Sequence, residues 1–168
     1  MRLFAAVFPS EGALQRLEAL QSELKAGISA PCSWTRRERM HLTLRFFGDN
    51  ADPSLTAQEV ERAVLGAAAG ELVMDVCSGF PNPRKARVLF AGASAPDERV
   101  VQLNRRLNPR EREPVPHLTL GRPRRTIQVP PVEFEPIAME VIQVALVHSI
   151  LAGPRAGYHI LDTWTLPR

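Results

Sequence analysis

The sequence lacks any long apolar run and contains very little cysteine. A helix that crosses a bilayer needs about 18 or more consecutive apolar residues, and no stretch of the 168-residue chain approaches that length. The apolar segment at 1–10 (MRLFAAVFPS) is also too short for the core of a signal peptide, so we interpret it as a buried strand. The two cysteines, Cys32 and Cys77, form no C-x-x-C pair and no disulfide framework. We therefore expect a cytoplasmic protein with two reduced, buried thiols and no membrane contact.

Several motifs of catalysis and cofactor binding are also missing. There is no P-loop and no G-x-G-x-x-G, so nucleoside triphosphates and dinucleotides have no recognisable cradle. There is no H-E-x-x-H or C-x-x-C to bind zinc, and no G-x-S-x-G around a serine nucleophile. We therefore expect no cofactor and no resident metal ion. The four histidines of the chain become the residues to explain.

Basic residues are concentrated in three runs. The formal net charge is only +3, with a pI of about 9.4, but most of the arginine lies at 35–39 (TRRER), 104–113 (NRRLNPRERE) and 121–125 (GRPRR). Arginine can hold phosphate oxygens through two N–H groups at once, which lysine cannot do. A general preference for arginine is the alternative explanation, because the chain contains only two lysines. Two of the runs flank a repeated tetrapeptide, which favours a phosphate-binding function.

The order of apolar and polar residues predicts alternating strands and helices. A compact apolar run followed by a proline indicates a first, central strand at 2–8. Ser10 is a candidate N-cap for an amphipathic helix at 11–27, where leucines recur at helical spacing. Similar arguments predict strands at 40–47, 71–80, 86–92 and 157–166, one long or bent strand within 134–151, helices at 52–70 and 94–107 (capped by Ser94), and a long loop at 121–136.

The tetrapeptide His-Leu-Thr-Leu occurs twice, at 41–44 and again at 117–120. Each copy follows the same series of predicted elements: an apolar strand that contains Leu-Phe-Ala, then a helix, then the histidine strand. Two copies are too few for a solenoid, which usually needs three or more units. The repeat therefore predicts a single domain over residues 1–168, built from two pseudo-symmetric α/β lobes that each place one histidine strand at a shared cleft.

Alternation along a strand puts the histidine and threonine of each copy on one face and the two leucines on the other. Two such strands at one cleft would bring together His41, Thr43, His117 and Thr119. One imidazole can be neutral while the other is protonated, so the pair can take a proton from a nucleophile and give one to a leaving oxygen. Two hydroxyls and the nearby Arg122 would stabilise charge that develops on phosphate oxygens. The pattern predicts phosphodiester hydrolysis without a metal ion.

Alternatives exist for each of these residues. A single His-x-Thr on a strand is usually structural, and zinc binding is disfavoured because threonine is a poor zinc ligand. The other histidines, His148 and His159, have no following x-Thr and are interpreted as strand residues. Alternation puts Phe47 on the histidine face, where it could stack on an RNA base, and it puts Phe46 in the core. Simple packing of Phe47 at the end of the strand is the alternative.

With these motifs in place, the sequence resembles the two-histidine phosphoesterases, whose mark is a pair of H-x-T-x motifs about half a chain apart. The contexts SWTRRERMHLTLRFFGD (33–49) and PVPHLTLGRPRR (114–125) are similar to the RNA 2′,3′-cyclic phosphodiesterase branch, formerly described as 2′–5′ RNA ligases. MRLFAAVFP at the start and HSILAGPRAGYHIL (148–161) near the end extend the resemblance over essentially the whole chain. It implies an α+β, bilobal fold with antiparallel sheets, flanking helices and a central cleft.

The resemblance also implies a reaction: hydrolysis of a terminal 2′,3′-cyclic phosphate on RNA to a 2′-phosphomonoester. Matched by motif, His41 would protonate the leaving 3′ oxygen and His117 would activate water. Thr43 and Thr119 would bind the phosphate together with Arg122. The order of acid and base rests on the resemblance alone, because the two halves of the sequence are nearly equivalent.

The chain departs from the family pattern at three places. TRRERM (35–40) stands where a proline-containing turn is frequent, Arg45 stands where lysine is common, and Gly121 replaces a usually larger residue. None of these changes removes a group that the mechanism needs. Hydrolysis of small cyclic nucleotides, 2′–5′ joining of RNA at the same site, and a non-catalytic RNA-binding module remain alternatives. We expect a monomer that acts on RNA with a 2′,3′-cyclic phosphate end and needs no protein partner.

Overall fold

Within residues 1–111 and 113–168, which the computed structural model describes, the chain forms three α-helices, one short 3₁₀ helix and ten strands. The elements in chain order are β1 (Leu3–Val7), α1 (Glu11–Gly27), β2 (Cys32–Trp34), the 3₁₀ helix η1 (Arg37–Arg39), β3 (Leu42–Gly48), α2 (Pro53–Leu65), β4 (Gly70–Met74), β5 (Val76–Phe80), β6 (Val88–Gly92), α3 (Glu98–Leu107), β7 (His117–Pro123), β8 (Ile137–Val141), β9 (Gln143–Ile150) and β10 (Gly157–Thr165). Arg112, part of the arginine run at 104–113, lies outside the described residues. None of the described helices is long and apolar enough to cross a membrane.

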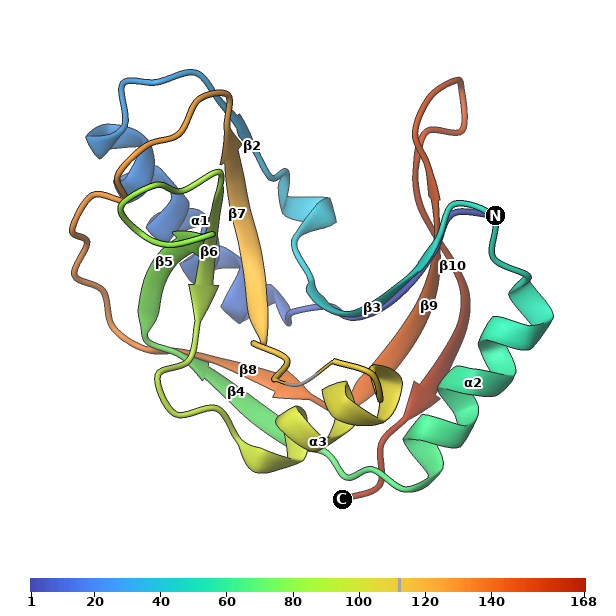
Figure 1. Ribbon diagram of the computed structural model, residues 1–168. Coiled ribbons are helices and arrows are strands. Elements are labelled where there is room, and N and C mark those ends of the chain that lie inside the picture. Colours follow the sequence, from blue (N-terminus) through green and yellow to red (C-terminus); the bar gives the residue numbers. More distant parts are fainter. Residues whose placement is uncertain (112) are drawn as a thin grey trace.

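The described strands form one large antiparallel sheet and one small one. The large sheet has eight strands in the order β10-β9-β1-β3-β7-β6-β5, with β2 paired to β7. The small sheet pairs β4 with β8. Figure 1 shows the large sheet as two diverging arms, β10-β9-β1-β3 (the first arm) and β7-β6-β5 (the second arm). The predicted α+β fold with antiparallel sheets is confirmed.

The two arms meet at the repeated tetrapeptides. The described register of β3 with β7 is the single pair Leu42–Leu118, and these leucines occupy the same position in the two copies of His-Leu-Thr-Leu. On either side the pattern repeats, because Val7 of β1 pairs with Leu42 and Ala91 of β6 pairs with Leu118. A pseudo-two-fold axis therefore passes between the two leucines, and the sequence repeat becomes a symmetry of the fold.

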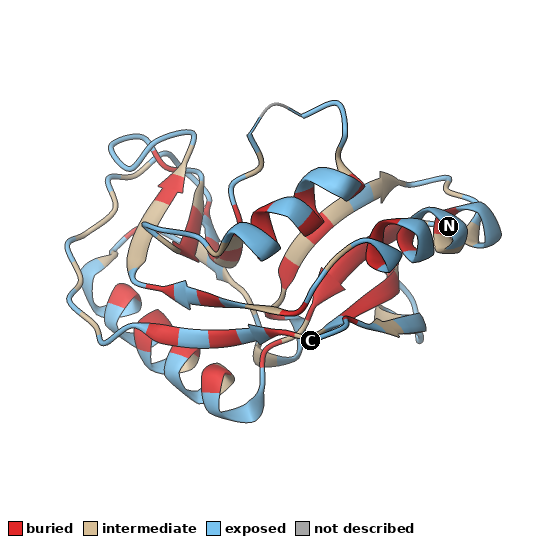
Figure 2. Ribbon diagram, turned by 90° about the horizontal axis from the view of Figure 1, so that it is seen from below, coloured by how far each residue is buried: buried red, intermediate tan, exposed pale blue. Residues whose placement is uncertain are grey.

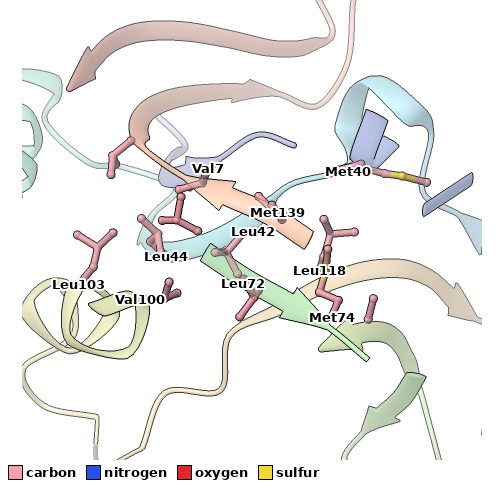
Figure 3. Close-up of a cluster of buried hydrophobic side chains, with 14 of the residues drawn as sticks. Val7, Met40, Leu42, Leu44, Leu72, Met74, Val100, Leu103, Leu118 and Met139 are labelled. Carbon is pink, nitrogen blue, oxygen red and sulfur yellow. The ribbon is translucent and has the colours of Figure 1, made fainter. Parts of the chain in front are cut away.

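The leucine sides of both histidine strands are buried in one core. These leucines are at most 3% exposed: Leu42, Leu44, Leu118 and Leu120. The small sheet covers them with Leu72, Met74 and Met139, as Figure 3 shows. Helix α1 contacts β8, and α3 contacts β3 and β4, which completes the layer outside the sheet. Burial of one leucine side chain stabilises the fold by about 1.5–3 kcal/mol, so this side is fixed and the polar partners in each strand must face the other way.

The helices show how local signals set their boundaries. Helix α1 spans the predicted residues, and the Ser10 hydroxyl accepts a hydrogen bond from the Ala13 backbone N–H at 3.3 Å, as an N-cap does. The third helix begins at Glu98 instead of at residue 94, because the Asp97 carboxylate is its cap. Ser94 instead donates its N–H and its hydroxyl to Asp75. In Figure 2 the helices carry buried residues on one side and exposed residues on the other.

Two predicted long strands are each divided between the two sheets. The segment 71–80 is interrupted at Asp75, so β4 joins the small sheet and β5 joins the large one. The segment 134–151 is likewise interrupted at Ile142, between β8 and β9. At the first break the Asp75 backbone N–H donates to the Gly92 carbonyl, outside the ladder of either strand. The prediction of one strand at 71–80 was therefore wrong, and the long or bent strand predicted within 134–151 is divided at Ile142 between the two sheets.

Candidate active site

The residues that the sequence singled out, other than Phe47, line one groove on the face of the large sheet opposite the buried leucines. His41, Thr43, Thr119 and Arg122 line a cavity of about 280 Å³. His117 lines a neighbouring cavity of about 330 Å³, whose walls also include Thr43, Thr119 and Arg122. Because the two cavities share three of these side chains, they are compartments of one groove (the histidine groove). The structure therefore brings together both histidines, both threonines and the arginine.

Each imidazole is held in the same way by the backbone two residues before it. His41 Nδ1 lies 2.7 Å from the Arg39 carbonyl oxygen, and His117 Nδ1 lies 2.8 Å from the Val115 carbonyl oxygen. A carbonyl can only accept, so Nδ1 carries the proton and donates in both rings. In the neutral form Nε2 is then the basic nitrogen. In one ring that nitrogen has a partner, because His41 Nε2 lies 2.8 Å from the hydroxyl oxygen of Thr43, which can donate to it.

Aromatic rings from each arm surround its own imidazole. Phe4 and Tyr158 lie with ring centroids 4.9 and 5.5 Å from the first imidazole. Phe80 and Phe90 lie 4.8 and 5.5 Å from the second. Phe4 and Phe90 come from the repeated Leu-Phe-Ala of β1 and β6, so the second element of the sequence repeat also contributes to the site.

This surrounding lowers the basicity of both imidazoles. Burial is the largest effect and moves the pKa of His41 and the pKa of His117 below the ordinary value of 6.5. The hydrogen bonds to the two carbonyls oppose the effect, since they favour the charged ring. Repulsion from the second imidazole lowers the pKa of His41 further, and repulsion from Arg122 lowers the pKa of His117. Both rings are therefore biased towards the neutral form, and a bound anion would raise both pKa values.

Irregular pairing changes which residues face the groove beyond the threonines. In β3 the register with β1 shifts so that Ala5 pairs with Arg45 while Ala6 pairs with Thr43, leaving Leu44 opposite no residue. In β7 the register with β6 shifts at the equivalent place, around Leu120. A bulge of this kind reverses the alternation of side chains. As a result, the fifth residue after each histidine lines the groove.

Those fifth residues are Phe46 and Arg122. The prediction that Phe47 faces the cleft and Phe46 lies in the core was wrong, because Phe46 is 47% exposed and lines the groove while Phe47 packs against the core. The guanidinium carbon of Arg45 lies 4.5 Å from the centre of the Phe47 ring and covers it. Arg122 lines both compartments, as its nearness in sequence to His117 suggested.

Several further groove residues were not predicted from the sequence, among them Tyr158, Arg39 and Arg2. Tyr158, the one tyrosine of the chain, reaches the groove from β10. The guanidinium of Arg39 lies 5.5 Å from the centre of the Tyr158 ring, and the guanidinium of Arg2 lies 4.5 Å from the centre of the Phe46 ring. The arginine run at 35–39 was a signal for Arg39. For the other two, contact depends on pairing between strands far apart in sequence, which no local pattern records.

The cysteines differ from the expectation that both would be buried. Cys32 and Cys77 are both half-buried and unbonded to each other. Burial raises the pKa of Cys77 to about 11 and also raises the pKa of Cys32, so both thiols are protonated at neutral pH. Over 1–111 and 113–168, no group of three or more histidine, cysteine, aspartate or glutamate side chains is arranged to hold a metal ion.

The groove has the groups that a phosphoesterase needs for catalysis: two oriented imidazoles, two hydroxyls and an arginine. Comparison with known proteins agrees with this class. The family model described as LigT like Phosphoesterase matches residues 7–90. The RNA 2′,3′-cyclic phosphodiesterase of Methanothermobacter thermautotrophicus is 34% identical over 132 residues, which cover 73% of this chain and 71% of that protein. The chain belongs to the LigT-like phosphoesterase family.

Two further relatives span nearly the whole chain. The RNA 2′,3′-cyclic phosphodiesterase of Thermotoga maritima is 26% identical over 177 aligned positions, covering 96% of this chain and 93% of that protein. Among solved structures, TT0787 of Thermus thermophilus superposes with a TM-score of 0.79 at 28% identity, covering 99% of this chain and 98% of that one. The similarity therefore includes both arms and both histidine strands.

Proposed function

We propose that this phosphoesterase hydrolyses the terminal 2′,3′-cyclic phosphate of RNA and leaves a 2′-phosphomonoester. The observation that carries the proposal is the matched pair of imidazoles, each held through Nδ1 by a backbone carbonyl and each lining the same groove. The relatives from Methanothermobacter and Thermotoga carry the name of this activity. The arginine-lined groove suits an anionic substrate.

The proposed reaction is an in-line displacement at phosphorus. His117 Nε2 takes a proton from water as the water oxygen forms a new bond to phosphorus. The bond from phosphorus to the 3′ oxygen breaks, and His41 Nε2 gives its proton to that oxygen. For this step His41 must be protonated although burial lowers its pKa. The negative charge of the bound phosphate supplies the compensation, because an adjacent anion raises the pKa of an imidazole.

The other polar residues of the groove are assigned to the phosphate. The Thr43 hydroxyl donates to His41 Nε2, and we propose that it turns to a phosphate oxygen when His41 is protonated. Thr119 holds the equivalent position on β7. We propose that Arg122, which lines both compartments, neutralises the two nonbridging oxygens with its fork of N–H donors. Phe46, instead of Phe47, is the aromatic side chain available to a base.

We further propose that residues 1–168 act as one domain. Each arm contributes one imidazole and one hydroxyl, so neither arm contains a complete site. The leucines beneath the groove come from both arms and share one core. RNA is the proposed partner of the groove.

The proposal is tested by turnover of a short RNA that ends in a 2′,3′-cyclic phosphate, with EDTA present. The expected product is a 2′-phosphate, identified by mass, by its removal with phosphatase, and by 3′-end chemistry that distinguishes a 2′-phosphate from a 3′-phosphate. His41→Ala and His117→Ala should each lower kcat/KM by about a hundredfold or more, as loss of a general acid or base usually does. His159→Ala is the matched control, because His159 lies outside the groove and bonds to the Arg155 carbonyl. Parent rates in both groove variants would refute the paired-imidazole mechanism.

The order of acid and base needs a second substrate, in which sulfur replaces the leaving 3′ oxygen. A thiolate leaves without a proton, since its pKa is far below that of an alcohol. His41→Ala should therefore regain most of its activity on the sulfur substrate, whereas His117→Ala should not. Recovery of the His117 variant alone would reverse the two roles and keep the reaction.

A further inference from the structure

The histidine groove continues into a third cavity beside η1. This cavity has a volume of about 350 Å³, within the range of about 300–1,000 Å³ typical of ligand pockets. Its walls include Trp34, Thr35 and Arg36. It shares with the His41 compartment the side chains of Thr35, Arg39, Arg122 and Tyr158. In Figure 1 the short η1 helix follows β2 and leads into β3, so it stands directly before the first histidine strand.

The walls of this cavity carry positive charge without a compensating carboxylate. Arg36 and Arg39 are exposed, and no ion pair involves either of them among the described residues. Arg37, which lies between them in sequence, instead pairs with Glu11 and Glu18 of α1. The acidic side chains of α1 thus neutralise only the middle arginine of the run. The two flanking guanidinium groups remain available to an anion.

The opposite end of the groove is less suited to a polyanion. The compartment around His117 includes Glu111 in its walls. Its own arginine, Arg45, lies 3.0 Å from a carboxylate oxygen of Glu59 and donates to the Leu107 carbonyl at 2.7 Å. Its positive charge is therefore already matched. A nucleic acid strand that leaves the catalytic phosphate gains more electrostatic stabilisation by continuing towards η1.

The backbone beside the third cavity is firmly held. The amide of Gln21 is buried and donates to the Thr35 carbonyl at 2.8 Å and to the Leu120 carbonyl at 2.9 Å. The Thr35 N–H donates to the same Leu120 carbonyl at 3.0 Å. These bonds fix the segment before Arg36 to the strand that carries the second histidine. A cation on a fixed backbone loses less entropy on binding than one on a free loop.

We propose that the third cavity binds the phosphodiester that precedes the terminal nucleotide, with Arg36 as its main contact. The inference rests on the proposed function, and it makes the end of an RNA chain, not a free cyclic mononucleotide, the preferred substrate. Arg122 lines all three cavities, so it stands between the terminal cyclic phosphate and the preceding phosphate.

The test compares adenosine 2′,3′-cyclic phosphate with the dinucleotide ApA that ends in the same cyclic phosphate. The parent protein should hydrolyse the dinucleotide with a kcat/KM at least about tenfold higher, which is the range of one charge-assisted hydrogen bond. Arg36→Ala should remove most of this preference, and Arg36→Lys should keep part of it. Arg62→Ala is the matched control, because Arg62 is exposed on α2 and outside the groove, and it should leave the ratio at the parent value.

Salt dependence gives an independent measurement. One additional phosphate contact should steepen the fall of log kcat/KM with log salt concentration by about 0.7 for the dinucleotide. Arg36→Ala should abolish that difference between the two substrates. Equal kcat/KM for both substrates in the parent protein, or an equal loss on both in Arg36→Ala, would overturn the subsite while leaving the proposed function intact. Failure of the parent protein to hydrolyse either substrate would refute the proposed function itself, and the subsite with it.

Discussion

The contact between Gly121 and Trp34 allows a quantitative prediction. A Cβ atom at residue 121 would lie 2.8 Å from Cε3 of Trp34 and 3.0 Å from Sγ of Cys32, closer than van der Waals contact permits. Backbone strain does not enter, because Gly121 is not among the glycines with positive φ. Gly121→Ala should therefore lower the free energy of unfolding by about 1–3 kcal/mol through overpacking alone. Without the clash the same change would stabilise by about 0.4–1 kcal/mol.

A double-mutant cycle measured by urea unfolding checks this reasoning. Trp34→Ala removes the ring that the new methyl group would meet, so Gly121→Ala should be much less harmful in that background. We expect a coupling free energy of about 1–3 kcal/mol. Gly12→Ala is the control, since a Cβ there meets nothing within 4 Å and the exposed helical site should gain about 0.5–1 kcal/mol. Additive effects of the two changes would show that Trp34 does not set the requirement for glycine.

The remaining predictions concern the groove and its support. The pH profile of kcat/KM should be bell-shaped with its maximum below pH 6.5, because burial lowers the pKa values of both histidines in the free enzyme. The profile of kcat should lie at higher pH, since the bound phosphate raises both pKa values. Identical profiles for kcat and kcat/KM would contradict this effect of the phosphate. Phe46→Ala should raise KM for RNA several-fold with little loss of stability, whereas Phe47→Ala should lower the unfolding free energy by about 1–3 kcal/mol. The reverse pattern would mean that Phe47 faces the groove, as strand alternation without a bulge predicts. Asn108→Ala should lower the free energy of unfolding in urea by about 1–3 kcal/mol, because the Asn108 amide donates to the backbone of β3 at 2.7 Å. An unchanged urea midpoint would show that this hydrogen bond does not stabilise the fold.

Features with a local cause were predictable from the sequence. The helix at 11–27 has both a hydroxyl cap and leucines at helical spacing, and it begins and ends where those signals place it. The two faces of His-Leu-Thr-Leu were also predictable, because leucine burial and strand alternation both favour the same orientation. The shared groove followed from the repeat, since equivalent halves place equivalent residues about one axis.

Features that depend on pairing were not predictable. The bulges at Leu44 and Leu120 leave no mark in composition, yet they decide that Phe46 and not Phe47 lines the groove. The breaks at Asp75 and Ile142 fall inside apolar runs, and only the partner strands show that each run serves two sheets. Both failures have one physical reason: hydrogen bonds between distant strands override the local period.

The pseudo-two-fold axis between Leu42 and Leu118 has a consequence for the assignment of acid and base. A cyclic phosphate turned over about that axis would meet the same two imidazoles with their roles exchanged, and the same 3′ oxygen would leave. The histidines alone therefore do not determine which imidazole acts as the acid. We expect that choice to depend on the pair of unlike residues at equivalent positions five residues downstream, an aromatic ring at Phe46 on one arm and a guanidinium at Arg122 on the other. These two residues make a nearly symmetric site unequal at its two ends: the end with Phe46 suits the nucleoside, and the end with Arg122 suits negative charge.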